Sequence, residues 1–276
     1  TSVPYLARDP TDHSVFNLFN GFLLRGVAPS VDVKTTAVWE WIHTAVADTK
    51  WKASWILTWL AWKVQRPHLK IAKFLVLFSD KTGTGKTSFQ EFLKSVLGTD
   101  LVLSLTSVDT YLKGENCEQL NKLVVCLDDI ERMKKREADQ LKARVTGNTF
   151  TYKKLYEDKL TMPCYADLVC TSNEGSPVFV DRDDRRVELI QMIPALSGKD
   201  KFWDRFYAEL SDLGVMASWF CFLSTFPIAV DIRSKSVRFD KQLLERTKAS
   251  FMNQAHQFVM EFFTNSDCIE ASSEYS

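Results

Sequence analysis

The feature that most constrains the fold is the pentapeptide GTGKT at residues 83–87, together with its position in the chain. It follows an apolar run, residues 72–78, which predicts a buried strand, and it opens the helical pattern of residues 87–97. A glycine-containing turn between a buried strand and a helix directs backbone N–H groups and the positive end of the helix dipole toward a bound phosphate. The sequence therefore predicts a phosphate-binding loop on an α/β sheet.

Each residue of this loop has an expected role. Lys86 reaches the β- and γ-phosphates of a bound nucleotide, and the Thr87 hydroxyl coordinates Mg²⁺. The other residues expected to surround the phosphates are Gly83, Thr84, Gly85 and Ser88. The full pattern of such loops has a glycine at position 80, where this chain has Asp80, but Gly83 and Gly85 supply the turn. ATP and Mg²⁺ are the expected ligands.

A second apolar run, residues 123–127, ends in two carboxylates, Asp128 and Asp129. We expect Asp128 to hold the metal, through water or Thr87, and Asp129 to polarise the attacking water. Glu131 is an alternative for the water-activating role. Acidic pairs after apolar runs are common, so the alternative interpretation is a strand that ends in a turn.

A third apolar run, residues 166–170, is followed by Thr171, Ser172 and Asn173. The Asn173 amide is expected to orient the attacking water or to sense the γ-phosphate, although this segment alone also fits a strand and a turn. Because α/β sheets bind ligands at the carboxyl ends of their strands, the three runs predict one site. Such continuous apolar runs are typical of parallel strands that are buried on both faces.

The charged segment of residues 181–186 contains Arg185 and Arg186. One of these residues is expected to be an arginine finger, which stabilises charge on the transferring phosphoryl group. The alternative interpretation is a solvated charged loop.

In this order of motifs the chain resembles the superfamily-3 helicases of DNA viruses and mobile elements, and most closely the helicase part of primase-helicases of poxvirus and phage or plasmid type. The resemblance covers residues 71–194, with a weaker similarity at 16–22. Lys86, Thr87, Asp128, Asp129 and Asn173 match the family's motifs directly. The resemblance implies an AAA+-like P-loop ATPase that assembles as a ring, with a hexamer as the expected form. A primase domain, attached or separate, is a further expected partner.

The family also has a basic hairpin between the acidic strand and the asparagine strand. In this chain residues 132–154 hold eight Lys or Arg and two acids, although the chain as a whole is neutral. Basic groups with aromatic rings among them suit contact with single-stranded DNA. The resemblance implies a lysine at the hairpin tip, which we assign to Lys153 or Lys154. The alternative interpretation, which is favoured for residues 132–142 alone, is an amphipathic helix on the surface.

The sequence divides into three segments: 1–70, mostly helical and expected to form a collar that assembles the ring; 71–194, the ATPase core; and 195–276, a helical lid or docking segment. Helices are expected at 33–66, 199–222 and 239–263. Four tryptophans at helical spacing are expected to pack in the core: Trp51, Trp55, Trp59 and Trp62.

Other features concern the compartment. Residues 213–230 carry no charge, but their small and polar residues favour a buried helix that leads into a strand over a membrane span. The six cysteines form no CxxC pair, which indicates reduced thiols in the cytoplasm or nucleus of a host cell. The chain begins with Thr1, as expected for a fragment of a longer protein.

These features predict a ring-shaped, ATP-dependent helicase that moves along single-stranded DNA during replication of a virus, phage or mobile element. One alternative is a P-loop ATPase switch or assembly factor that never unwinds nucleic acid. Another is a monomeric small-molecule kinase, against which the long insertion between Asp128 and Asn173 argues.

Overall fold

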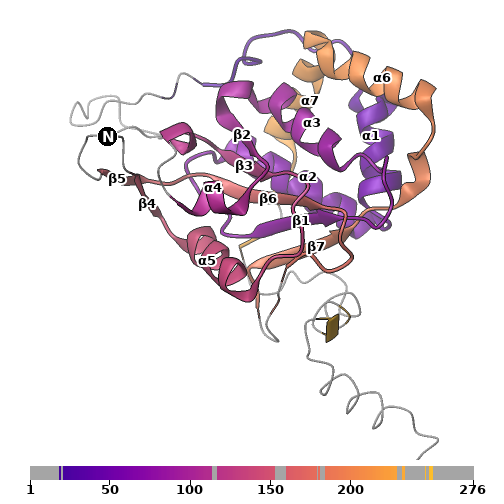
Figure 1. Cartoon of the computed structure of the whole chain (residues 1–276). Coiled ribbons are helices and arrows are strands. Elements are labelled where there is room, and N and C mark those ends of the chain that lie inside the picture. Colours follow the sequence, from indigo (N-terminus) through magenta and orange to yellow (C-terminus); the bar gives the residue numbers. More distant parts are fainter. Residues whose placement is uncertain are drawn as a thin grey trace, which may run out of the picture.

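The computed structural model describes residues 19, 21–113, 117–152, 160–178, 180, 184–228, 232–233, 246 and 249–250. Its centre is a parallel five-stranded sheet with the strand order β2-β3-β6-β1-β7 (Figure 1). The strands are β1 (Phe74–Phe78), β2 (Val102–Leu105), β3 (Val124–Leu127), β6 (Asp167–Ser172) and β7 (Val187–Gln191). The predicted runs at 72–78, 123–127 and 166–170 are β1, β3 and β6, so all three strand predictions are confirmed.

Both faces of the sheet are covered by helices, which confirms the predicted α/β fold class of a P-loop NTPase-like sheet with helices on either side. Along β1, Leu75 and Leu77 belong to one hydrophobic cluster, and Phe74, Val76 and Phe78 belong to the other. This alternation follows from the two-residue period of a strand.

The first cluster lies between the sheet and five helices, three of which, α3, α6 and α7, are seen together on one side of the sheet in Figure 1. These five helices are α1 (Ala37–Trp41), α2 (Lys50–Gln65), α3 (Lys86–Leu97), α6 (Asp200–Ser211) and α7 (Leu213–Thr225). The second cluster includes residues of α4 (Val108–Leu112) and α5 (Lys135–Thr146). The remaining short helical turns are η1 (Val33–Thr35), η2 (Ile42–Val46), η3 (Thr99–Leu101), η4 (Cys117–Gln119) and η5 (Pro194–Leu196).

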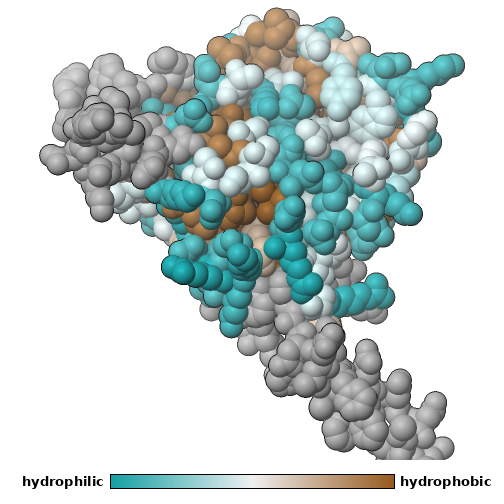
Figure 2. Space-filling view, viewed as in Figure 1, coloured by the Kyte–Doolittle hydropathy of each residue, from teal (hydrophilic) through white to brown (hydrophobic). Residues whose placement is uncertain are grey.

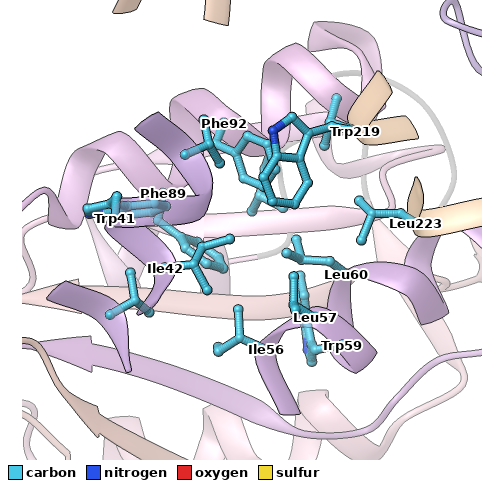
Figure 3. Close-up of a cluster of buried hydrophobic side chains, with 14 of the residues drawn as sticks. Trp41, Ile42, Ile56, Leu57, Trp59, Leu60, Phe89, Phe92, Trp219 and Leu223 are labelled. Carbon is cyan, nitrogen blue, oxygen red and sulfur yellow. The ribbon is translucent and has the colours of Figure 1, made fainter. Parts of the chain in front are cut away.

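The tryptophan stripe lies on α2, which is buried along most of its length. Trp55, Trp59 and Trp62 are buried, as predicted, whereas Trp51 in the first turn is 48% exposed. Trp59 packs near Phe89, which in turn packs near Trp41, in the cluster drawn in Figure 3. The same cluster contains residues of α6 and α7. The predicted division at residues 70 and 194 therefore crosses a single hydrophobic core, and the separate roles of the three segments stay a prediction.

Two of the expected helices are interrupted. Within residues 33–66 the chain is extended at Ala47, and α2 starts again behind Thr49, whose side chain accepts a hydrogen bond from the Lys52 N–H. Within 199–222 the break is at Asp212, whose carboxylate accepts from the N–H groups of Gly214 and Val215 and so caps α7. The helix expected at 239–263 lies outside the described residues, apart from short pieces.

Two predictions about surface and membrane properties can be compared with the described residues. The uncharged stretch beginning at residue 213 forms α7, and none of the described helices is long and apolar enough to cross a membrane. The basic segment at 132–142 leads into α5, whose apolar residues, among them Ala138 and Leu141, face the core. The predicted amphipathic helix is confirmed from Lys135 onward, and contact of its exposed basic residues with DNA stays a prediction.

A small antiparallel hairpin forms a second sheet. It pairs β4 (Thr149–Tyr152) with β5 (Leu160–Pro163), between the acidic strand β3 and the asparagine strand β6 in sequence. Lys153 and Lys154 belong to the connection between these two strands and lie outside the described residues.

Candidate functional site

The glycine loop joins β1 to α3 in the way that the sequence predicts. Gly83 and Gly85 have φ values of +71° and +87°, a region that side chains rarely adopt. A Cβ atom at Gly85 would lie 2.5 Å from Cη2 of Trp203 and 2.6 Å from Nε1 of Trp41. Both the backbone conformation and the close packing therefore require glycine at this position. The N–H groups of the first turn of α3 face the loop because the helix begins at Lys86.

Lys86 is folded into the loop. Its Nζ donates hydrogen bonds to the carbonyl oxygens of Ser79 at 3.3 Å and Lys81 at 3.0 Å. Burial lowers the pKa of Lys86, and the carboxylates of Asp129, Asp80 and Asp128 oppose this shift. The Lys86 ammonium group is thus held by two carbonyl oxygens. A phosphate bound in the loop would take their place as its hydrogen-bond partner.

The two carboxylates that follow β3 accept hydrogen bonds from residues at the carboxyl end of β6 or directly after it. Thr171 donates its hydroxyl to Oδ1 of Asp128 and accepts a hydrogen bond of 2.9 Å from the backbone N–H of Asp129. The Asn173 amide donates to Oδ1 of Asp129. Asp129 adopts a φ of +51°, which is uncommon for a residue with a side chain. These contacts form because β6 lies between β1 and β3 in the sheet.

The glycine loop, Lys86, the two carboxylates, Thr171 and Asn173 line one cavity of about 480 Å³ at the carboxyl ends of the strands. The predicted residues that line it are Gly83, Thr84, Gly85, Lys86, Thr87, Ser88, Asp128, Asp129 and Asn173. Glu131, the alternative to Asp129, is exposed and does not line the cavity.

Four lining residues were not predicted from the sequence: Thr82, Thr171, Trp203 and Tyr207. Thr171 follows an apolar run that predicts a strand, and its small hydroxyl gives no separate signal in the sequence. Trp203 and Tyr207 come from α6, more than 100 residues after the loop in the sequence, and their spacing is that of any helix that packs on a core. The Tyr207 hydroxyl lies 2.9 Å from Oγ of Ser88.

Arg185 and Arg186 lie at the amino ends of the strands, opposite to the ends where the cavity is found. The N–H of Phe74, the first residue of β1, donates to the carbonyl oxygen of Arg186. Because β1 and β7 are parallel, the arginines precede the strands while the cavity follows them, about 13 Å or more along the sheet. The fold therefore does not bring either arginine into the cavity of its own chain.

The two arginines differ in their contacts. The Arg186 guanidinium pairs with Asp184 at 3.1 Å, and Asp184 also accepts an ion pair of 2.9 Å from the buried Lys142. The Arg185 side chain is exposed, while its carbonyl oxygen accepts a hydrogen bond of 2.6 Å from Nζ of Lys73. Burial would raise the pKa of Asp184, but hydrogen bonds from Arg186 and Lys142 hold it below the ordinary range.

The donor set of the cavity fits a magnesium ion held jointly with phosphates. Oγ1 of Thr87 and Oδ1 of Asp128 lie 3.5 Å apart, so two hard oxygen ligands face the same space. Within the described part of the chain no group of three or more His, Cys, Asp or Glu residues is arranged to hold a metal ion. Two oxygen ligands agree with Mg²⁺, which is commonly bound by one or two protein ligands, water and substrate phosphates.

Comparisons with known proteins give a family of unknown function and solved structures with the same fold. The sequence profile of the family of unknown function DUF5906 matches residues 77–186, a span that contains the loop, both acids and Asn173. No curated protein matches the chain.

Among solved structures, the apo C-terminal region of NrS-1 (305–718) is similar, with a TM-score of 0.74 and 18% identity, covering 93% of this chain and 63% of that one. An A-form apo structure of the NrS-1 C-terminal region has a TM-score of 0.69 and 20% identity, over 84% of this chain and 56% of the other. The chain thus spans less than two thirds of these structures. A structure of JCV helicase has a TM-score of 0.46 and 15% identity over 79% of this chain and 59% of that chain, a level that does not establish a common fold.

Proposed function

We propose that this chain is an ATP-hydrolysing motor of the superfamily-3 helicase type, which works as a ring on single-stranded DNA. The observation that carries the proposal is the cavity at the carboxyl edge of the sheet. It gathers the glycine loop, Lys86, two carboxylates and an asparagine amide from three separate strand ends. The likeness to the NrS-1 C-terminal region supports the α/β fold on which this proposal is built.

Each group in the cavity has a role in hydrolysis. Lys86 leaves its carbonyl partners and binds the β- and γ-phosphates, which the N-terminus of α3 also faces. Thr87 and Asp128 would hold Mg²⁺, which supplies charge neutralisation at the phosphates. Asp129 accepts a proton from the attacking water, and Asn173, which holds Asp129, orients that water.

The arginine finger comes from a neighbouring subunit in this proposal. Arg185 is exposed at the amino ends of the strands, whereas the cavity lies at their carboxyl ends. It can therefore reach only the cavity of another copy of the chain. Arg186 is engaged by Asp184, which makes Arg185 the proposed finger. An interface that joins the amino end of the strands of one molecule to the cavity of the next is head-to-tail, and such an interface forms a ring when the rotation between neighbours closes.

The DNA strand is bound by the basic segment between β3 and β6. Exposed basic side chains lie just before α5 and in its first turn, and hydrophilic side chains cover this region of the surface (Figure 2). These side chains are Arg132, Lys134, Lys135 and Arg136. Lys153 and Lys154, in the connection of the β4–β5 hairpin, are the proposed residues that grip the strand.

The test is steady-state ATP hydrolysis with and without single-stranded DNA. We expect DNA to stimulate turnover, Lys86→Ala to abolish it, and the double variant Lys153→Ala/Lys154→Ala to keep basal turnover and lose the stimulation. The matched control is Lys34→Ala/Lys50→Ala, which removes two exposed lysines near α1 and α2 and should behave as wild type.

Two results would contradict the proposal. Turnover that ignores DNA in a confirmed ring would favour the ATPase switch over the helicase. ATP hydrolysis that persists in Lys86→Ala would show that the reaction does not take place in this cavity.

A further inference from the structure

The cavity has two chemically different ends. Its polar side chains gather at the strand ends, where Asp128, Asp129 and Asn173 face the loop. The side formed by α6 presents two aromatic rings, Trp203 and Tyr207, one helical turn apart on the same face. A molecule that fills the cavity therefore meets charge at one end and ring surfaces at the other.

Both rings are fixed in place. The indole N–H of Trp203 donates to the carbonyl oxygen of Leu196 at 3.0 Å, and the edge of its ring lies against Gly85. The Tyr207 hydroxyl forms a hydrogen bond with the hydroxyl of Ser88, which follows the phosphate loop directly. The two ring centroids are 6.2 Å apart with an interplanar angle of 34°. Tyr207 is nevertheless 46% exposed, which leaves ring surface open for a ligand.

This aromatic side carries little hydrogen-bonding capacity. Among the described residues that line the cavity, α6 contributes no side chain with a polar group other than the indole N–H of Trp203 and the hydroxyl of Tyr207, and both already have partners. Discrimination between bases by a protein depends on donors and acceptors that match the base edge. Stacking on a ring is tolerant, because every base has a π face.

We propose that the α6 side of the cavity is a stacking subsite for the nucleotide base, with Tyr207 as the ring that the base covers and Trp203 as its support. The substrate class is then nucleoside triphosphates in general, with weak choice between ATP, GTP, CTP and UTP. This inference rests on the proposed nucleotide hydrolysis, and it adds that the phosphates, more than the base, determine which molecules bind.

The experiment measures kcat and KM for the four nucleoside triphosphates on wild type, Tyr207→Leu and Tyr207→Phe. We expect the four wild-type KM values to lie within about tenfold of one another, and Tyr207→Leu to raise all four by about tenfold, the size of one lost stacking contact. Tyr207→Phe keeps the ring and removes the bond to Ser88, so its KM values should stay close to wild type. Asp204→Ala, on an exposed position of α6, is the matched control.

Inorganic triphosphate, which has no base, separates stacking from a general loss of structure. Its inhibition constant should be the same for wild type and Tyr207→Leu. A strong preference for one base, or equal KM values in Tyr207→Leu and wild type, would overturn the subsite while leaving the hydrolase intact. Weakened inhibition by triphosphate in Tyr207→Leu would assign Tyr207 to loop structure instead and would also overturn it. Absence of any Lys86-dependent turnover would overturn the proposed function, and the subsite with it.

Discussion

At the scale of single residues, the candidate site depends on backbone conformations that most side chains avoid. Gly85 needs its positive φ to bring the loop against Trp41 and Trp203. Asp129 adopts a positive φ without being glycine, and hydrogen bonds with Thr171 and Asn173 hold it there. Such backbone strain is maintained only where surrounding contacts determine the conformation. The loop and the acid are therefore fixed before any ligand arrives.

Gly85→Ala tests the close packing under the loop. The added Cβ would collide with two indole rings at a positive φ, so we expect the free energy of unfolding to fall by about 1–3 kcal/mol and nucleotide binding to be lost. Urea unfolding and nucleotide titration measure the two effects. Gly175→Ala is the control, since a Cβ there meets nothing within 4 Å. A fully stable, nucleotide-binding Gly85→Ala would contradict this account of the loop.

Asp184 provides a prediction about pH. Its pKa is held below the ordinary 3.8, so its charge stabilises the fold above that value, and this contribution disappears as the pH falls through the lowered pKa. At neutral pH, Asp184→Ala removes the 2.9 Å ion pair with the buried Lys142 and should cost about 3–5 kcal/mol in unfolding free energy. Denaturant unfolding as a function of pH should show the wild-type advantage shrinking below 3.8. A stability difference between wild type and Asp184→Ala that grows as the pH falls would contradict the lowered pKa of Asp184.

The central residues of the site could be predicted because their signals are local. Lys86 and Thr87 stand in a short motif between a strand and a helix, and Asp128 and Asn173 each follow an apolar run. Tyr207 could not be predicted, because its place in the cavity results from the packing of α6 on α1 and α3. No pattern within α6 itself records that packing.

At the scale of elements, the position of β6 determines the site. It pairs with β1 on one side and β3 on the other, so Thr171 and Asn173 lie between the phosphate loop and the acids. Hydrophobic patterns revealed β1, β3 and β6 because each contains an uninterrupted apolar run, which in β6 is residues 168–170. They missed β2 and β7, whose runs are interrupted by Ser104 and by Glu188, a buried carboxylate paired with Lys73 at 2.6 Å. The strand order itself depends on pairings between distant segments, which no local pattern encodes.

The helix α2 gives a test of burial at this scale. Trp59 is fully buried and Trp51 is half exposed on the same helix. Trp59→Ala should lower the free energy of unfolding by about 3–5 kcal/mol through the cavity that it leaves. Trp51→Ala, at a half-exposed position, should cost less, about 1 kcal/mol. Thermal or urea unfolding of the two variants makes the comparison, and equal effects would contradict the buried position of α2.

At the scale of the whole molecule, the phosphate loop and the proposed finger lie at opposite ends of one strand. Lys73, which directly precedes β1, donates to the carbonyl oxygen of Arg185 and pairs with Glu188, both on the segment that leads into and forms β7. The other end of β1 leads into the loop. In the proposed ring, each chain therefore offers a cavity to one neighbour and Arg185 to the other.

Mixing two inactive variants tests this arrangement. Arg185→Ala and Lys86→Ala should each show little turnover alone. A 1:1 mixture should regain about a quarter of the wild-type rate, because that share of neighbouring pairs in a head-to-tail ring has both an intact loop and an intact finger. Arg25→Ala, another exposed arginine, should keep full activity. A mixture as inactive as its components would contradict a finger that is supplied by the neighbouring chain.

The β4–β5 hairpin stands apart from the five-stranded sheet, and this has a consequence for how such a protein can diverge. Most of the chain is committed to two hydrophobic clusters, where a change in length would displace packed side chains. The hairpin has its own two-stranded ladder, so residues can be added to or removed from its connection without moving the strands that carry the cavity. We expect lineages of this fold to vary most in hairpin length. The part that is proposed to contact DNA can then adapt while the proposed hydrolytic cavity stays the same.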